Sequence, residues 1–326
     1  MCSTTRNRLK RAVAHRLIKE SFDPLNMADD TLRSRLEALN RGPLPAVAAV
    51  RHPAKSFIHT SQPAMPATQP DLRAPVTSRP IGGLLRSGEI VETLYGPHLQ
   101  IDLPLESYWQ GGAKLLASRQ EFLRTQLATA NQAIEPSIVL EPQFAAFATA
   151  LPDRAVALDL ETCGLAGSAL FLVGLLRQVA NVPTIQLLLA RNYAEEAAVL
   201  SSFWQILAEQ DVLLTFNGKT FDWPMVVERS IRHRLEPPTG RDRWVHIDIL
   251  HHARRRWKKQ LPNCRLQTLE RHVCRRQREA DIPGHAIPGV YADFVRTGFE
   301  RDMDSVLHHN ALDLVTLFDL AHRLAA

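Results

Sequence analysis

The stretch Ala155-Val-Ala-Leu158-Asp159-Leu160-Glu161 decides the fold, because four apolar residues run directly into two acids one residue apart. The apolar run predicts a buried β-strand. Successive side chains on a strand point to opposite faces, so Asp159 and Glu161 face the same side of the sheet. Burying unpaired charge costs several kcal/mol. A divalent cation such as Mg²⁺ or Mn²⁺ would compensate both acids; a solvated strand end is the alternative.

A second acidic position lies in Asn217-Gly-Lys-Thr-Phe221-Asp222, between an apolar run and a helix-like segment. Ligands in open α/β sheets bind beyond the carboxyl ends of the strands, where this junction is expected to lie. We expect Phe221 to pack and Asn217 to fix the loop. Asp222 is read either as a ligand or as a helix cap.

The third position is His308-His309-Asn310-Ala311-Leu312-Asp313, inside the periodic apolar run at 306–320. Residues four apart lie on one face of a helix, which places His309 beside Asp313. Asp159, Glu161, Asp222 and Asp313 then form a set of four carboxylates with an imidazole next to the last.

The order of elements predicts the fold class. Strands are expected at 155–160, 169–177, 184–190, 212–216 and 244–250, with helices at 195–210 and 221–234. Three strands followed by helix, strand, helix and strand is the order of a ribonuclease H-like α/β fold. We therefore expect a mixed five-stranded sheet flanked by helices, with a mostly helical part at 251–326.

Composition divides the rest of the chain into three segments. Residues 1–40 read as an N-terminal helical extension, and residues 41–80 as a proline-rich linker that is too poor in apolar residues to form a core. Residues 81–150 read as a lead-in subdomain with strand-like pieces at 89–94 and 98–103 and a helix at 113–130. The domain with the acidic motifs spans 151–326.

Charge and cysteine content indicate which kind of partner and which cellular compartment to expect. The 326 residues carry a formal net charge of +5, which mildly favours a polyanionic partner. The four cysteines show no metal-site spacing and are expected to be reduced thiols. No apolar stretch has the length of a membrane span. These features predict a cytoplasmic protein with no membrane partner.

The three motifs together resemble the exonuclease motifs of the DEDD superfamily. The sequence is similar, over about residues 150–325, to the YprB-like, ribonuclease H-like family of predicted bacterial exonucleases. Four further stretches carry the resemblance: His246-Ile-Asp248-Ile-Leu250, Ala253-Arg-Arg-Arg-Trp257, Leu266-Gln-Thr-Leu-Glu270 and Asp281-Ile-Pro-Gly284. The resemblance implies a metal-dependent exonuclease of 3′→5′ polarity that acts on DNA or RNA ends.

The resemblance also implies a two-metal mechanism. Asp159 would bridge two Mg²⁺ or Mn²⁺ ions, Glu161 and Asp313 would hold the ion nearest the attacking water, and Asp222 would hold the second ion through water. A histidine would be the general base. Relatives with a histidine base place it five residues before the last Asp, at His308. Relatives with a tyrosine base place it four before, at His309, which a continuous helix puts about 40° from Asp313.

A basic tract follows the fifth predicted strand. The residues expected to bind the nucleic-acid backbone, together with Asn217, are Arg254, Arg255, Arg256, Lys258 and Lys259. Further arginines run to Arg278, against one acid, Glu270. Asp248, at the end of that strand, is expected either to orient a ligand or to have a structural role.

Two other functions remain open from the sequence. One is a catalytically silent nucleic-acid-binding module, against which the mutually repelling acids argue. The other is a structure-specific endonuclease, since related folds host several phosphodiester chemistries.

Overall fold

The computed structural model describes residues 82–132, 140–164, 167–237, 244–279 and 281–326. The helices predicted within residues 1–40 and the linker at 41–80 lie outside these ranges. Within them, no helix is both long enough and apolar enough to cross a lipid bilayer.

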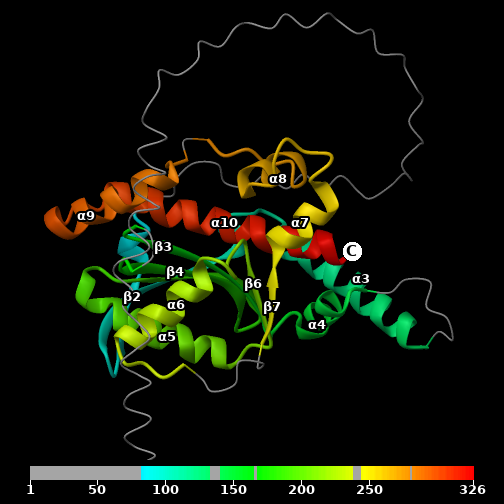
Figure 1. Ribbon diagram of the computed structural model, residues 1–326, viewed down its shortest axis with the longest axis horizontal. Helices are drawn as coiled ribbons and strands as arrows, with labels where there is room; N and C mark the ends of the chain where they lie inside the picture. The colour runs from blue at the N-terminus through cyan, green and yellow to red at the C-terminus, as the bar shows by residue number, and fades with distance from the viewer. Residues whose placement is uncertain (1–81, 133–139, 165–166, 238–243, 280) are drawn as a thin grey trace, which may run out of the picture. The chain divides into compact units, whose positions relative to one another are not determined.

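The centre of the fold is a mixed seven-stranded sheet (Figure 1). The order across the sheet is β1-β2-β5-β4-β3-β6-β7. The strands are β1 (Glu89–Thr93), β2 (Gly96–Pro104), β3 (Ala155–Thr162), β4 (Leu170–Val179), β5 (Val182–Leu189), β6 (Val212–Thr215) and β7 (Val245–Asp248). The expected count of five was wrong, because the two strand-like pieces at 89–103 join the same sheet: β2 pairs antiparallel with β5, from Leu99↔Leu189 to Pro104↔Thr184. The α/β class is confirmed.

Chain connections explain the strand directions. β3, β4 and β5 follow one another as antiparallel hairpins. The β4–β5 turn has Ala180 and Asn181 at φ +46° and +65°, the left-handed geometry of a tight two-residue hairpin turn. β6 and β7 run parallel to β3, because helices α5 (Glu196–Ala208) and α6 (Asp222–Arg232) return the chain between strands.

Helix α10 (Arg301–Ala325) covers the face of the sheet opposite α5 and contacts β3, β4, β5 and β6 (Figure 1). Its own outer sides are covered by other helices, so it is buried along most of its length. These helices are α3 (Gly112–Gln132), α4 (Pro142–Ala150), α7 (Ile249–Trp257), α8 (Leu266–His272) and α9 (Ile287–Thr297). Short 3₁₀ turns complete the element order at Leu85–Ser87, Leu105–Ser107, Tyr193–Glu195 and Gly284–Ala286.

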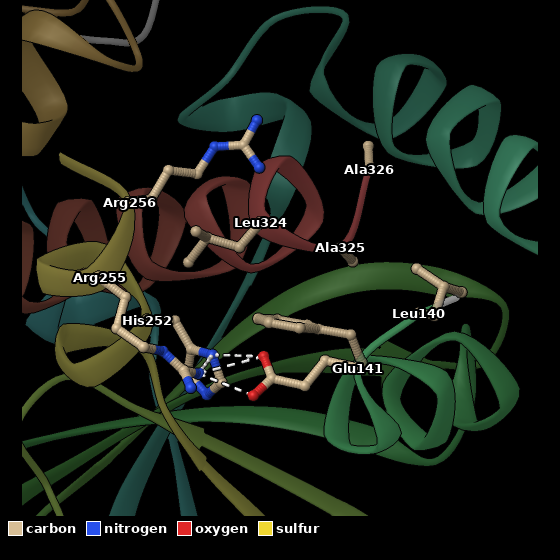
Figure 2. A pocket seen from close by; sticks show the side chains of 9 residues that line it. Leu140, Glu141, His252, Arg255, Arg256, Leu324, Ala325 and Ala326 are labelled. Carbon is tan, nitrogen blue, oxygen red and sulfur yellow. Dashed lines mark hydrogen bonds and ion pairs between the residues drawn. The ribbon is translucent and has the colours of Figure 1, made fainter. Parts of the chain in front are cut away.

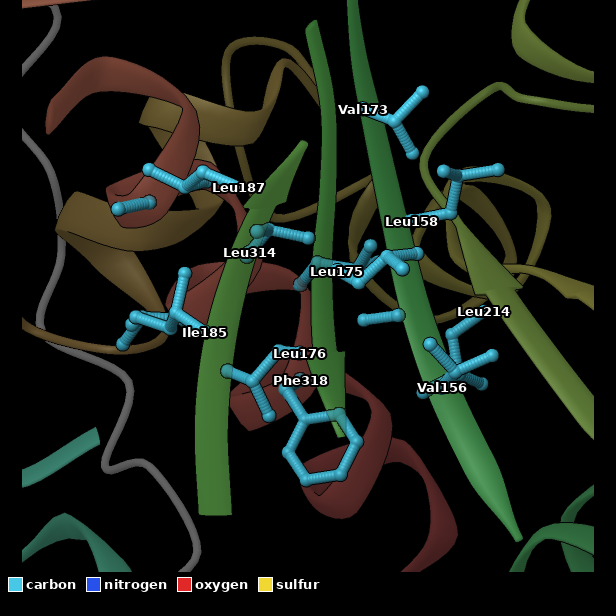
Figure 3. Packing of buried hydrophobic residues seen from close by; sticks show 14 of the residues in the cluster. Val156, Leu158, Val173, Leu175, Leu176, Ile185, Leu187, Leu214, Leu314 and Phe318 are labelled. Carbon is cyan, nitrogen blue, oxygen red and sulfur yellow. The ribbon is translucent and has the colours of Figure 1, made fainter. Parts of the chain in front are cut away.

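The apolar core lies between α10 and the central strands (Figure 3). Leu314 and Phe318 of α10 belong to this core, and α10 packs on the face of β4 that Gly174 and Leu176 present. Each such side chain contributes about 1.5–3 kcal/mol when it leaves water. The α10 face that presents Leu314 also presents Asn310 one turn earlier, so apolar packing on the sheet sets the position of this polar residue.

One buried carboxylate fastens the outer segments to α10. Asp319 is fully buried and pairs with Arg119 of α3, with Arg276 (Nη1–Oδ2 2.7 Å) and with Arg323 (Nε–Oδ1 2.9 Å). Burial alone would raise the pKa of Asp319, but the three guanidinium groups bring it well below its usual range. Arg276, part of the basic tract, is therefore an internal anchor.

Gly174 of β4 leaves the space through which Asn310 approaches the sheet. A Cβ atom at Gly174 would lie 1.7 Å from Asn310 Oδ1 and 3.0 Å from Leu314 Cδ1. We predict that Gly174→Ala lowers the free energy of unfolding by about 1–3 kcal/mol through overpacking. The melting temperature should fall by roughly 2–4 °C for each kcal/mol.

Gly289→Ala is the matched control for that prediction. A Cβ atom at Gly289, within α9, would meet nothing within 4 Å. Alanine should be tolerated there, since it favours a helix over glycine by about 1 kcal/mol. Equal melting temperatures for the two variants would contradict the tight contact of α10 with β4.

Candidate active site

Asp159 and Glu161 lie in the second half of β3, where the strand leaves the fully buried core. Asp159 is opposite Gly174 on the neighbouring strand, and a register shift follows Glu161. The side chain of Asn310 donates from Nδ2 to Asp159 Oδ2 over 2.8 Å. The strand therefore delivers the acid pair directly beneath α10.

Asp222 is the first residue of α6. It lies at the same end of the sheet as Asp159 and Glu161, because β6 runs parallel to β3. Its loop is held by Asp248, a buried residue that accepts hydrogen bonds from the backbone N–H groups of Asn217 (2.8 Å) and Lys219 (3.2 Å). Asp248 also caps α7 through Leu250 N. The structure thus places Asp248 as the support of the loop that carries Asp222.

Two expectations about that loop have different outcomes. Asn217 adopts a left-handed conformation, φ +65°, at the bend between β6 and α6, which fits a loop-fixing residue. Its contact with substrate stays a prediction. Phe221 was expected to pack, and this was wrong: the residue is 62% exposed. The apolar anchor is its neighbour Trp223, which packs against the core.

Helix α10 supplies the remaining groups. It begins at Arg301, so residues 308–313 are on continuous helix. His309 Nε2 lies 3.5 Å from Asp313 Oδ2. His308 points elsewhere: its ring centroid is 5.4 Å from that of Tyr108, and neither ring nitrogen has a hydrogen-bond partner among the described residues. The structure brings His309, and not His308, to the carboxylates.

The segment between α8 and α9 adds two site residues that the sequence reading missed. Asp281 Oδ1 lies 2.7 Å from His309 Nδ1. Arg278 contacts Glu270 (Nε–Oε2 2.6 Å), Asp281 (Nη1–Oδ2 3.2 Å) and Asp313 (Nη2–Oδ1). The available signals were the Asp281-Ile-Pro-Gly284 stretch and the single acid, Glu270, within the basic tract.

Burial of the acids, followed by the repulsion among them, dominates the electrostatics of the cluster. Burial, and then the charges of Asp313, Glu161 and Asp222, raise the pKa of Asp159 well above its usual range. Burial is also the main cause that raises the pKa of Glu161 to about 8 and that of Asp222 to about 7. Burial alone would lower the pKa of His309, but its hydrogen bond to Asp281 and the charge of Asp313 raise it to about 9. The cluster as it stands attracts protons or other cations.

The cluster has the donor chemistry for a hard divalent cation but not yet the arrangement. Its four acids offer only oxygen ligands, as Mg²⁺ and Mn²⁺ prefer. Among the described residues, however, no group of three or more His, Cys, Asp or Glu side chains is placed to hold a metal ion. Arg278 and His309 occupy the two oxygens of Asp313, and Asn310 occupies one of Asp159. The donor set suits such an ion, and Asp159, Glu161, Asp222 and Asp313 are the residues that would hold it.

The basic tract divides between surface and interior. Arg254, Arg255, Arg256, Lys258 and Lys259 are exposed at the end of α7. Arg255 pairs with Glu141 (2.8 Å), at the rim of an open hollow of about 400 Å³ between α7, the start of α4 and the end of α10 (Figure 2). The four acids do not line this hollow. Arg276 and Arg278 turn inward.

Comparisons with known proteins agree with the fold. A family model described as the RNase_H superfamily matches residues 156–325, just over half of the chain. The chain is 37% identical over 171 residues to the uncharacterized protein YprB of Bacillus subtilis (strain 168). That match covers 50% of this chain and 40% of YprB, so the chain spans less than half of that relative's length.

A solved structure of a family B DNA polymerase is also similar to the chain. The polymerase comes from the hyperthermophilic archaeon Pyrobaculum calidifontis, and it is 17% identical with a TM-score of 0.43. The similarity covers 53% of this chain and 24% of the polymerase. With the family model matching 156–325 and YprB matching half of the chain, the chain belongs to the RNase_H superfamily, in its YprB-like group.

Proposed function

We propose that the protein is a metal-dependent nuclease that hydrolyses nucleic-acid phosphodiester bonds at the Asp159 cluster, with two divalent cations and with 3′→5′ exonuclease polarity. Membership of the RNase_H superfamily indicates a nuclease that binds nucleic acid. The observation that carries the rest is the convergence of four acids from β3, α6 and α10: besides burial, the charges of Asp313, Glu161 and Asp222 raise the pKa of Asp159.

The charges of the cluster support two cations. Glu270 balances Arg278, and Asp281 balances a protonated His309. Four carboxylates remain, Asp159, Glu161, Asp222 and Asp313, whose formal charge two divalent ions neutralise. Such ions, when bound, polarise the phosphate and lower the pKa of the attacking water. Asp159, Glu161, Asp222 and Asp313 are the residues that would hold these ions.

His309 fits the base of this reaction. Its hydrogen bond with Asp281 assigns the Nδ1 proton and leaves Nε2 to accept a proton on the side of Asp313. The pKa of about 9 belongs to a cluster without divalent cations. Nearby dications would lower it, since like charges disfavour the imidazolium form.

The surface around the acids fits a single strand. Phe221, directly before Asp222, offers an exposed ring on which a terminal base could stack. Helix α7 starts next to Asp248 and carries its exposed basic residues to its far end, nine residues or about 13 Å away. The strand would run from the acids along α7.

One observation favours the silent binding module. Asp313 is held by Arg278, and within the described residues no group of three or more His, Cys, Asp or Glu side chains is placed to bind a metal ion. The module would keep the basic end of α7 and bind nucleic acid without cutting it. A cleavage assay with cluster variants separates the two functions.

We predict that the protein releases mononucleotides from a 5′-labelled single strand with Mn²⁺ or Mg²⁺. Asp159→Asn and Asp222→Asn should lower the rate by at least about 10²-fold, as loss of one transition-state charge contact does. Asp293→Asn, which changes an exposed acid of α9 paired with Arg296, should cut normally.

Four outcomes are informative in that assay. Degradation by both cluster variants at the wild-type rate overturns the proposal. Binding by the wild type without cleavage identifies the silent module. Cleavage of a closed circular strand identifies an endonuclease, and protection by a blocked 3′ end establishes the polarity.

We predict that His309→Asn lowers kcat by about 10²–10⁴-fold, the usual contribution of a general base. His308→Leu should cut at close to the wild-type rate, because the ring of His308 is buried against Tyr108 away from the acids. Single-turnover rates of the two folded variants check this. A larger loss in His308→Leu would reverse the assignment.

We predict that the stability of the chelator-treated protein falls as the pH rises from about 6.5 to 9. The pKa of folded Glu161 is raised to about 8 and that of Asp222 to about 7, so the folded state holds protons that the unfolded state has released. His309 acts in the same direction, since its stabilisation is full below 6.5 and lost as the pH passes about 9. Below pH 6.5 His246 and His308, whose pKa values burial lowers to about 4, act in the opposite direction.

Urea midpoints at pH 6.5 and 8.5, with EDTA or with Mn²⁺, test that prediction. The midpoint in EDTA should be lower at pH 8.5, and Mn²⁺ should restore it there. Asp159→Asn should flatten the pH dependence. A midpoint in EDTA that rises with pH in the wild type but not in Asp159→Asn would contradict the repulsion among the acids.

A further inference from the structure

Arg278 sits at the meeting point of three carboxylates from three parts of the chain. Its Nε donates to Glu270 of α8, its Nη1 to Asp281 before α9, and its Nη2 to Asp313 of α10. The side chain is 6% exposed. Each guanidinium nitrogen serves a different acid, an arrangement that requires a planar fork and that lysine cannot reproduce.

These contacts close a ring of charged groups. Arg278 holds Asp313, Asp313 lies 3.5 Å from His309 Nε2, His309 Nδ1 lies 2.7 Å from Asp281, and Asp281 returns to Arg278. The candidate metal ligand Asp313 and the candidate base His309 are both members. One buried guanidinium therefore fixes the orientation of both.

The two oxygens of Asp313 are held unequally. Oδ1 takes the short contact with Arg278, while Oδ2 faces His309 at 3.5 Å, longer than a usual hydrogen bond of 2.7–3.2 Å. A cation could take Oδ2 without breaking the contact of Arg278 with Oδ1. Carboxylates that bind metals are commonly held in this way, by a hydrogen bond to the other oxygen.

We propose that Arg278 is a positioning residue of the candidate metal site: it grips Asp313 through Oδ1 so that Oδ2 faces the cation, and through Asp281 it keeps His309 Nε2 on the same side. This inference rests on the proposed function. Arg278 also contacts Glu270 of α8. It therefore connects the segment that follows the basic end of α7 to α10, which carries Asp313 and His309.

An Arg278 that only competes with the cation would affect Mn²⁺ affinity in the opposite direction. Arg278 carries a positive charge beside the site, so electrostatics alone predicts that its removal tightens the binding of a divalent cation. If Arg278 positions Asp313, its removal weakens that binding instead. The sign of the change in Mn²⁺ affinity therefore separates a residue that orients the ligand from one that competes with the metal.

The test is the Mn²⁺ dissociation constant of the full chain, measured by isothermal titration calorimetry without nucleic acid. Arg278→Gln should raise the dissociation constant of one of the two ions by about 10–100-fold, the usual loss when a residue that supports a metal ligand is removed. Arg278→Lys, which keeps the charge but not the fork, should weaken the same ion. Circular dichroism establishes that each variant is folded.

Glu270→Gln keeps the test decisive if Arg278→Gln does not fold. It leaves Arg278 in place but loosens one of its three anchors, so the same ion should bind several-fold more weakly. Mn²⁺ affinity that is unchanged or tighter in the folded variants overturns the positioning role while the proposed function stands. A wild type with no Mn²⁺ binding that depends on Asp159 overturns both.

Discussion

The structure depends on a crowding of like charges that it holds in place: acids from β3 and α10 lie half-buried and close together where helix and strand pack. Apolar contacts such as Leu314 against β4 force the approach, and Gly174 removes the side chain that would prevent it. The polar groups around the acids then offset part of their negative charge. Asn310 donates to Asp159, Arg278 to Asp313, and His309 lies against Asp313. A fold without a use for these charges would be more stable with apolar residues in their place.

Much of the fold could be predicted from the sequence, because local patterns determine it. The run from Ala155 predicts β3 from its first residue, and alternation and turn residues predict its hairpin partners. The count of strands was wrong, because β2 enters the sheet through long-range pairing with β5, which has no local signal. The helical phase of residues 309 and 313 was sufficient to place His309 beside Asp313.

The inner part of the site could not be predicted in the same way. Arg278 reads in sequence as one more cation of a basic tract, yet it is buried among three acids that lie 8, 3 and 35 residues away. Burial of a charge is decided by tertiary contacts, and composition does not report it. Phe221 shows the converse: apolar character suggested packing, but the start of α6 presents its ring to solvent.

The basic tract divides into exposed residues and buried residues, which have different roles at the site. Residues at the end of α7 face solvent and suit a phosphate backbone, while Arg276 and Arg278 anchor the following segment to Asp319 and Asp313 of α10. One continuous stretch thus supplies both the surface for a polyanion and supports for the acids. The affinity of the surface would fall steeply with added salt. The internal arginines, buried and paired, would be screened far less.

The most direct measurement is a crystal structure of the chain grown with Mn²⁺, with anomalous diffraction to locate the ions. We predict two peaks about 3.5–4 Å apart between Asp159, Glu161, Asp222 and Asp313, with Arg278 still on one oxygen of Asp313. A cluster that stays free of Mn²⁺ at saturating concentration, with Arg278 and Asn310 holding the acids, would contradict it.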